Sequence, residues 1–108
     1  MSNSTYAISI PALLRGLSIV SSLIDKAEAF STEKKISPDV LINARLAPDM
    51  LPFSGQVQRV SDTSKGVIGR LTSIEPPKMP DEEKTFAELQ ERVAKTVDFL
   101  KSVDESAF

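Results

Sequence analysis

Apolar residues recur at steps of three and four along three stretches of this chain, and no other feature restricts the fold as strongly. This spacing places the apolar side chains of an α-helix on one face. The three stripes consist of Ile10, Leu13, Leu14, Leu17, Val20, Ile24 and Ala27; Met50, Phe53, Val57, Val60, Ser64, Val67 or Ile68, and Leu71; and Phe86, Leu89, Val93, Val97, Leu100 and Val103. The chain shows neither strand-like alternation nor a hairpin turn sequence. The sequence therefore predicts an all-α antiparallel helical bundle of three long helices and one short helix.

Prolines indicate where the helices begin and end, because a proline inside a helix costs about 3 kcal/mol or more. Pro11 leaves two alternatives. Either Ser9 caps a helix that has Pro11 in its first turn, or the helix begins near Thr5 and Pro11 kinks it. Further along, Ser37 followed by Pro38 is a start signal for a short helix.

Two prolines only four residues apart, Pro48 and Pro52, predict a sharp corner. The residue before a proline is pushed out of helical geometry, so the short helix should end at Ala47. If Asp49 is the N-cap of the next helix, Pro52 lies in its first turn, where backbone N–H groups have no intrahelical partner. The sequence thus predicts one helix ending at Pro48 and the second long helix beginning after Asp49.

Residues 73–84, SIEPPKMPDEEK, are expected to form a loop because they contain three prolines and no apolar period. The next four residues, TFAE, match a capping box. In this motif the Thr85 hydroxyl accepts from the backbone N–H of Glu88, and the Glu88 carboxylate accepts from the backbone N–H of Thr85. The third long helix should therefore begin directly after Thr85.

Charged residues near this third helix are interpreted as a solvated surface. Glu88 with Arg92, and Glu91 with Lys95, have the i,i+4 spacing of exposed ion pairs. The acidic run at residues 81–83 lies just before the helix, where negative charge is favoured by the helix dipole.

Composition excludes several classes of function. The chain has no cysteine and no histidine, which removes thiolate catalysis, disulfides, the commonest general base and the commonest metal ligand. Its 13 basic and 15 acidic residues are well mixed, so a nucleic-acid partner is not expected. The apolar N-terminal stretch, residues 6–24, has no basic start and is interrupted by Arg15, so neither a targeting segment nor a membrane span is predicted. We expect a cytoplasmic protein.

Three quoted stretches resemble one known family. They are PALLRGLSIVSSLIDKAEAF, LINARLAPDMLPFSGQVQRVSDTSKGVIGRL and KTFAELQERVAKTVDFL, and together they span about residues 5–103. They are similar to domain of unknown function nineteen ninety-three, a family of the DinB/YfiT-like helical bundles. The resemblance implies a DinB-like four-helix bundle with an up-down-down-up connection.

The resemblance also implies differences from the family. Its members continue into a fourth helix, whereas this sequence stops at Phe108. We therefore expect a single domain, residues 1–108, that is incomplete at its C-terminal end and lacks its last helix. The apolar groove so exposed predicts a homodimer through an apolar helix face. Many relatives in the wider superfamily hold a divalent metal with three histidines. This chain has none, so neither a metal nor another cofactor is expected.

Five polar residues at the proline corner and the start of the second long helix are the candidate ligand-binding residues: Arg45, Asp49, Gln56, Arg59 and Asp62. A helix N-terminus in this region offers free N–H groups to an anionic ligand. The competing interpretation is structural, with Asp49 as an N-cap and Arg45 in an ion pair or bonded to carbonyl groups. No catalytic residue is predicted.

Three interpretations of function remain open from the sequence. The first is a non-catalytic, self-associating bundle that binds a small ligand between helices. The second is a metal-independent enzyme that holds a small anionic substrate with Arg45, Asp49 and Arg59. It requires these three side chains to converge in one pocket. The third is a fragment with no function of its own, which would be molten and expose an apolar face.

Overall fold

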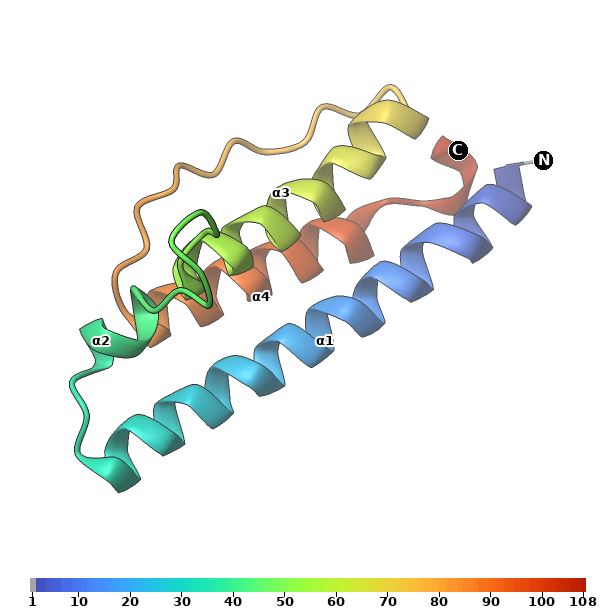
Figure 1. The fold of residues 1–108 in the computed structure, drawn as a ribbon. Coiled ribbons are helices and arrows are strands. Elements are labelled where there is room, and N and C mark those ends of the chain that lie inside the picture. The colour runs from blue at the N-terminus through green and yellow to red at the C-terminus, as the bar shows by residue number, and fades with distance from the viewer. Residues whose placement is uncertain (1) are drawn as a thin grey trace.

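A computed structural model describes residues 2–108, and all of its regular elements are helical. They are α1 (Ser2–Lys34), α2 (Pro38–Ile42), α3 (Phe53–Leu71), α4 (Phe86–Ser102) and the short 3-10 helix η1 (Glu105–Ala107). Helix α1 runs antiparallel to α3 and α4, which are parallel to each other (Figure 1). The predicted all-α bundle of three long helices and one short helix is confirmed. Among the described helices, the order is up-down-down.

All three long helices contribute to one core, as their apolar stripes predicted. Its buried apolar side chains are Ile10, Leu17, Ile24, Ile42, Val57, Ile68, Phe86, Leu89, Val93, Leu100 and Val103. The residues at the two ends of the second stripe are not buried as predicted: Met50 is 39% exposed and Leu71 is 46% exposed. Between α3 and α4 the core contains a polar contact, in which the buried hydroxyls of Ser61 and Thr96 lie 2.8 Å apart.

Helix α1 is longer at its N-terminus than a cap at Ser9 would allow. It begins at Ser2, so Pro11 lies inside it and Ser9 is not an N-cap. The Ser9 hydroxyl instead donates to the carbonyl of Thr5 at 2.6 Å. Of the two alternatives left by the sequence, the early start near Thr5 is therefore the better one.

The proline corner differs from its prediction in both helix boundaries. Helix α2 has five residues and ends at Ile42, well before Ala47. Asp49 is not an N-cap: the N-cap of α3 is Pro52, whose extended backbone, with ψ of 168°, directly precedes the helix. The corner is closed by a hydrogen bond from the backbone N–H of Phe53 to the carbonyl of Ala44, at 2.9 Å. Because this hydrogen bond joins Ala44 to Phe53, the residues between them form the turn, and the residues on both sides of Pro48 are not helical.

Residues 72–85 form a strap that returns along the molecule from the end of α3 to the start of α4 (Figure 1). The Lys65 ammonium donates to the carbonyl of Pro77 at 2.9 Å, and the Gln58 amide donates to Glu83 at 3.1 Å. Gly69 lies under the strap, and a Cβ at this position would be only 3.0 Å from the ring of Pro76. The strap is therefore packed on α3, and its path makes α3 and α4 parallel.

The predicted ion pair between Glu88 and Arg92 is wrong. Arg92 is 2% exposed and pairs with Asp62 at 2.6 Å, Asp81 at 2.9 Å and Glu83 at 3.1 Å. Asp81 and Glu83 of the acidic run therefore bind a buried arginine. The sequence interpretation gave this run only a favourable interaction with the helix dipole.

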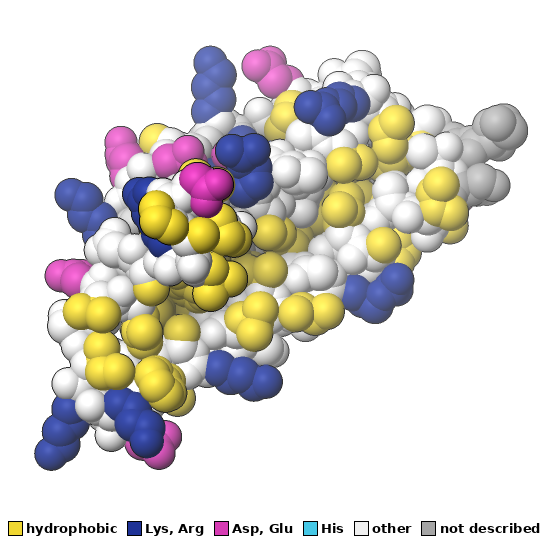
Figure 2. Space-filling view, in the orientation of Figure 1, with side chains coloured by type: hydrophobic (Ala, Val, Ile, Leu, Met, Phe, Trp, Pro, Cys, Tyr) yellow, Lys and Arg dark blue, Asp and Glu magenta, His cyan; other side chains and the backbone are white. Residues whose placement is uncertain are grey.

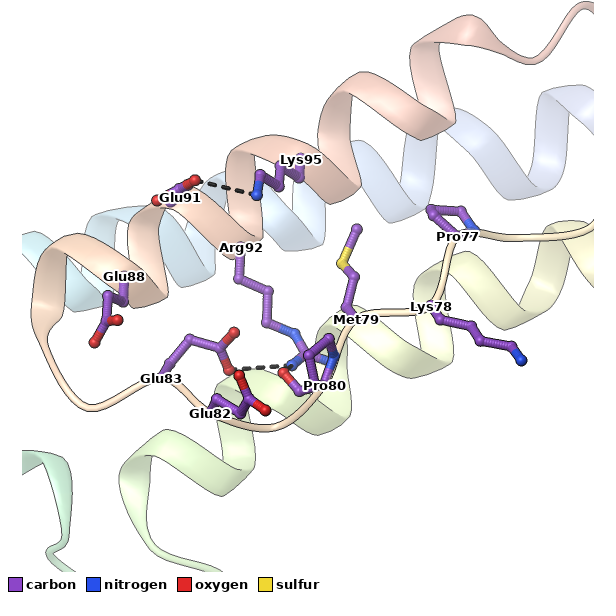
Figure 3. Close-up of a pocket in the computed structure, with 10 residues that line it drawn as sticks. All are labelled: Pro77, Lys78, Met79, Pro80, Glu82, Glu83, Glu88, Glu91, Arg92 and Lys95. Carbon is purple, nitrogen blue, oxygen red and sulfur yellow. Dashed lines mark hydrogen bonds and ion pairs between the residues drawn. The ribbon is translucent and has the colours of Figure 1, made fainter.

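Two local predictions for α4 are confirmed. Thr85 and Glu88 form the complete capping box, with both of its reciprocal hydrogen bonds present. Glu91 and Lys95 form an exposed i,i+4 ion pair at 3.1 Å, shown in Figure 3.

Candidate binding site at the proline corner

The proline corner forms a pocket of about 470 Å³ that is open to solvent on one side, a volume within the range of small-molecule pockets. Its walls come from α1, α2, the corner itself and the first turn of α3. The lining residues are Ala27, Leu41, Ala44, Arg45, Leu46, Met50, Leu51, Phe53 and Gln56. Seven of the nine are apolar, and Leu46 is 92% exposed to solvent. An exposed apolar surface gathered into one concavity is typical of a binding site.

Two of the five predicted site residues, Arg45 and Gln56, line this pocket. One terminal nitrogen of Arg45 donates to the carbonyl of Pro48 at 3.3 Å, and the Gln56 amide nitrogen donates to the carbonyl of Leu51, also at 3.3 Å. Both bonds are at the long end of the hydrogen-bond range and lie in exposed positions. A ligand could therefore replace them at little cost.

The structure does not bring the other three predicted residues into this pocket. Asp49 is exposed and is not part of the lining. Arg59 lines a separate apolar groove of about 290 Å³ between α1 and α3. Asp62 lies on another side of α3, where it accepts from Arg92 at 2.6 Å. Arg45, Asp49 and Arg59 thus do not line a common cavity.

A second cavity, of about 450 Å³, lies beneath the strap. Figure 3 shows its charged side chains, which come from the strap and from α4. Arg92 is already surrounded by Asp62, Asp81 and Glu83, and Lys95 is paired with Glu91. The buried arginine of this crevice is therefore engaged in attaching the strap. The charged side chains on its lining that have neither an ion pair nor a hydrogen bond within residues 2–108, Lys78 and Glu82, lie on the strap itself.

The apolar lining was not recognised from the sequence. Leu46, Met50 and Leu51 lie in the non-helical corner, and two of them, Leu46 and Leu51, do not fit any helical stripe. Their signal was compositional: several large apolar residues fall within a short stretch that two prolines keep out of helical geometry. Such residues cannot reach a helix interface and are left on the surface of the corner.

A three-histidine metal site of the kind used in the wider superfamily does not fit this chain, which has no histidine. Within residues 2–108, no group of three or more His, Cys, Asp or Glu side chains is arranged to hold a metal ion.

Helix α1 is long and apolar enough to cross a membrane by length and composition alone, with a mean hydropathy of 1.7 in its most apolar window. This is weak evidence, because the core helix of a soluble protein and an N-terminal signal sequence pass the same test. Ile10, Leu17 and Ile24 of α1 are buried, but only 17% of that window is.

Comparison with known proteins agrees with this fold. No curated protein matches the chain. A crystal structure of a DinB family member protein from Shewanella denitrificans is similar to it over 99% of the present chain, with a TM-score of 0.93 and 37% sequence identity. The alignment covers 61% of that protein, so the present chain spans about three fifths of its relative's length. The profile of a domain of unknown function, DUF1993, matches residues 5–108. The chain therefore belongs to the DUF1993 family of DinB-like helical bundles.

Proposed function

We propose that this protein is a non-catalytic binding protein whose corner pocket holds a small molecule between its helices. The cavity of about 470 Å³ at the proline corner is the observation that supports this function. Its backbone is held by hydrogen bonds from Phe53 to Ala44 and from Met50 to Ala47, so the pocket exists before a ligand arrives. A preformed pocket binds without first ordering a loop, which favours affinity.

The geometry gives less support to a metal-independent enzyme. That alternative needs Arg45, Asp49 and Arg59 around one substrate, and these residues face different cavities or solvent. Without histidine or cysteine, the chain also lacks the side chains most often used as general base or nucleophile.

Native mass spectrometry of the protein as purified from cells tests the binding function. We expect a discrete small-molecule adduct on the wild-type protein. The Ala44→Phe variant should lose the adduct, because Ala44 lines the pocket and a phenyl ring fills it. Ala87→Phe is the matched control, since Ala87 is exposed on α4 and does not line the pocket. An adduct that survives in Ala44→Phe, or a wild-type protein that carries none, would contradict the proposal.

We further propose that the protein self-associates through the outer face of α1. Ile8, Ile19, Leu23 and Phe30 are between 45% and 77% exposed, and their spacings of 11, 4 and 7 residues are close to whole helical turns. They therefore form a second apolar stripe on a helix whose other face is already in the core. In Figure 2, apolar side chains lie along the part of the surface where Figure 1 places α1, with Lys and Arg side chains among them. A second copy, bound across a two-fold axis, would cover the stripe. A cytoplasmic location remains part of this proposal.

A further inference from the structure

We infer that the ligand of the corner pocket is a small carboxylate with an apolar body, and that its head group pairs with Arg45. This inference rests on the proposed binding function and adds the chemical class of the ligand. It follows from the charge of the pocket, the geometry of its polar groups and its size.

The pocket contains one cation and no anion. Arg45 is the single charged residue among the nine described lining residues. The guanidinium of Arg45 donates a hydrogen bond to the neutral carbonyl of Pro48. Arg45 takes part in none of the ion pairs found within residues 2–108. Arg92 shows the opposite situation, because three carboxylates surround it. An arginine left without a carboxylate beside an apolar concavity is complementary to an anionic head group.

The shape of the guanidinium favours a carboxylate. Its planar fork of N–H donors can bind both oxygens of a carboxylate in parallel, and such charge-assisted bonds are stronger than neutral ones. The bond to Pro48 uses one donor at 3.3 Å, so most of the fork remains available. The Gln56 amide on the same lining adds a neutral donor that helps to orient the head group.

The rest of the lining fits an alkyl or aryl body. Leu41, Leu46, Met50, Leu51 and Phe53 supply most of the wall, and Leu46, Met50 and Leu51 are 92%, 39% and 42% exposed without a ligand. Covering them with an apolar chain removes this surface from water, at about 25 cal/mol per Å². A volume of 470 Å³ lies toward the small end of the pocket range and suits one chain better than a two-chain lipid.

Calorimetric titration with three probes that share one alkyl chain tests the inference: decanoate, decanol and decyltrimethylammonium, the two ions below their critical micelle concentrations and the alcohol below its solubility limit. We expect wild type to bind decanoate about tenfold or more tightly than decanol, because a hydrogen bond to a charged group contributes more than a neutral one. The ammonium probe should bind most weakly, since its charge repels Arg45.

Variants of Arg45 assign the preference to this side chain. Arg45→Gln should lower decanoate affinity about tenfold and leave decanol affinity unchanged, while Arg45→Lys retains part of the preference. Arg70→Gln is the matched control, because Arg70 is exposed in the last turn of α3 and does not line the pocket. Thermal melts of each variant establish that it is folded.

The outcomes separate the ligand class from the binding function. Equal binding of decanoate and decanol by wild type, or a preference that survives in Arg45→Gln, overturns the carboxylate class. Failure of all three probes overturns the class as well, and the cellular adduct then decides the binding function independently. Decanoate binding that is undiminished in Ala44→Phe shows that the site lies elsewhere, and both proposals fail.

Discussion

Among single residues, Arg92 joins three parts of the chain. Its guanidinium donates to Asp62 on α3 and to Asp81, Glu83 and the carbonyl of Pro80 on the strap, while its backbone belongs to α4. Its Nε is buried without a partner, so the group is not fully satisfied even with these bonds. Its ion pairs and hydrogen bonds offset the free-energy cost of burying the charge, and they also attach the strap to α3 and α4.

Arg92→Met should destabilise the protein by about 2 kcal/mol, less than the ~3–5 kcal/mol for breaking a fully buried pair, because Asp62 and Asp81 are partly exposed and can rehydrate. Lys95→Met is the control. Its ion pair with Glu91 is 64% exposed on both sides and should contribute less than about 1 kcal/mol. Urea unfolding measures both values, and a loss in Arg92→Met no larger than in Lys95→Met would contradict this role.

Glu88 gives a second residue-scale prediction. The backbone N–H of Lys84 is the main cause that holds the pKa of Glu88 below its ordinary value of 4.5, with help from the hydroxyl and N–H of Thr85. Because the folded pKa is depressed, the stabilisation is present above the unfolded pKa and is lost as pH falls through the folded pKa. Glu88→Gln should therefore be less stable than wild type at neutral pH.

This difference should begin to shrink as the pH falls to the ordinary pKa of 4.5, and should vanish only below the lower pKa of the folded state, where wild-type Glu88 is itself neutral. Thermal melts between pH 3 and pH 7, about the span that brackets glutamate titration, check this. The same change at Glu91, whose carboxylate is in an exposed pair, is the control. A Glu88→Gln difference that is independent of pH would exclude the charged carboxylate as the stabilising form.

At the scale of elements, two of the three glycines of α3, Gly66 and Gly69, lie in different surroundings. A Cβ on Gly66 would meet nothing within 4 Å, whereas a Cβ on Gly69 would lie 3.0 Å from the Pro76 ring on the strap. Alanine is favoured over glycine inside a helix by about 1 kcal/mol. Gly66→Ala should therefore stabilise the protein by about 0.5–1 kcal/mol.

Gly69→Ala gains the same helix propensity but must displace the strap. We expect it to be at least about 0.5 kcal/mol less stable than Gly66→Ala. Chemical denaturation of the two variants under one set of conditions makes the comparison. Equal stabilisation by both would mean that the strap does not rest on α3 at Pro76.

Local sequence signals predicted the elements well and the tertiary contacts poorly. The apolar stripes, the capping box at Thr85 and the Glu91–Lys95 pair depend on residues within a few positions of one another, and all are present except the two ends of the second stripe. The partners of Arg92 are 9 to 30 residues away, on the strap and α3, so no pattern within α4 could reveal them.

The candidate site shows the same division. Arg45 and Gln56 are polar residues near a helix start, as the prediction requires, and both line the corner pocket. Asp62 meets the same criterion, but Arg92 of α4 binds it instead. The predicted cap at Asp49 failed because an acidic residue before a helix is a common signal, and the actual boundary depends on how the corner closes between Ala44 and Phe53.

At the scale of the whole molecule, which measures 50 × 24 × 21 Å, the longest helix is α1. It carries apolar side chains on two faces. If the outer face is a dimer interface, the melting temperature should rise with protein concentration, because association stabilises the folded state by mass action. Ile19→Glu should abolish this dependence and give a monomer in sedimentation velocity experiments.

Leu71→Glu is the control for this prediction. Leu71 is 46% exposed and belongs to α3 rather than to α1, so the variant should remain as associated as wild type. A wild-type protein that is monomeric at all concentrations, with a constant melting temperature, would refute self-association through α1.

The parallel arrangement of α3 and α4 also affects the time course of folding. Two antiparallel helices joined by a short turn can meet soon after they form, but here the strap must first return along α3. The contacts between Ser61 and Thr96, 35 residues apart, close only with that longer segment. Closing a segment of this length costs conformational entropy before the contacts between α3 and α4 offset it. The path of the strap should therefore make this bundle fold more slowly than one whose helices are joined by short turns.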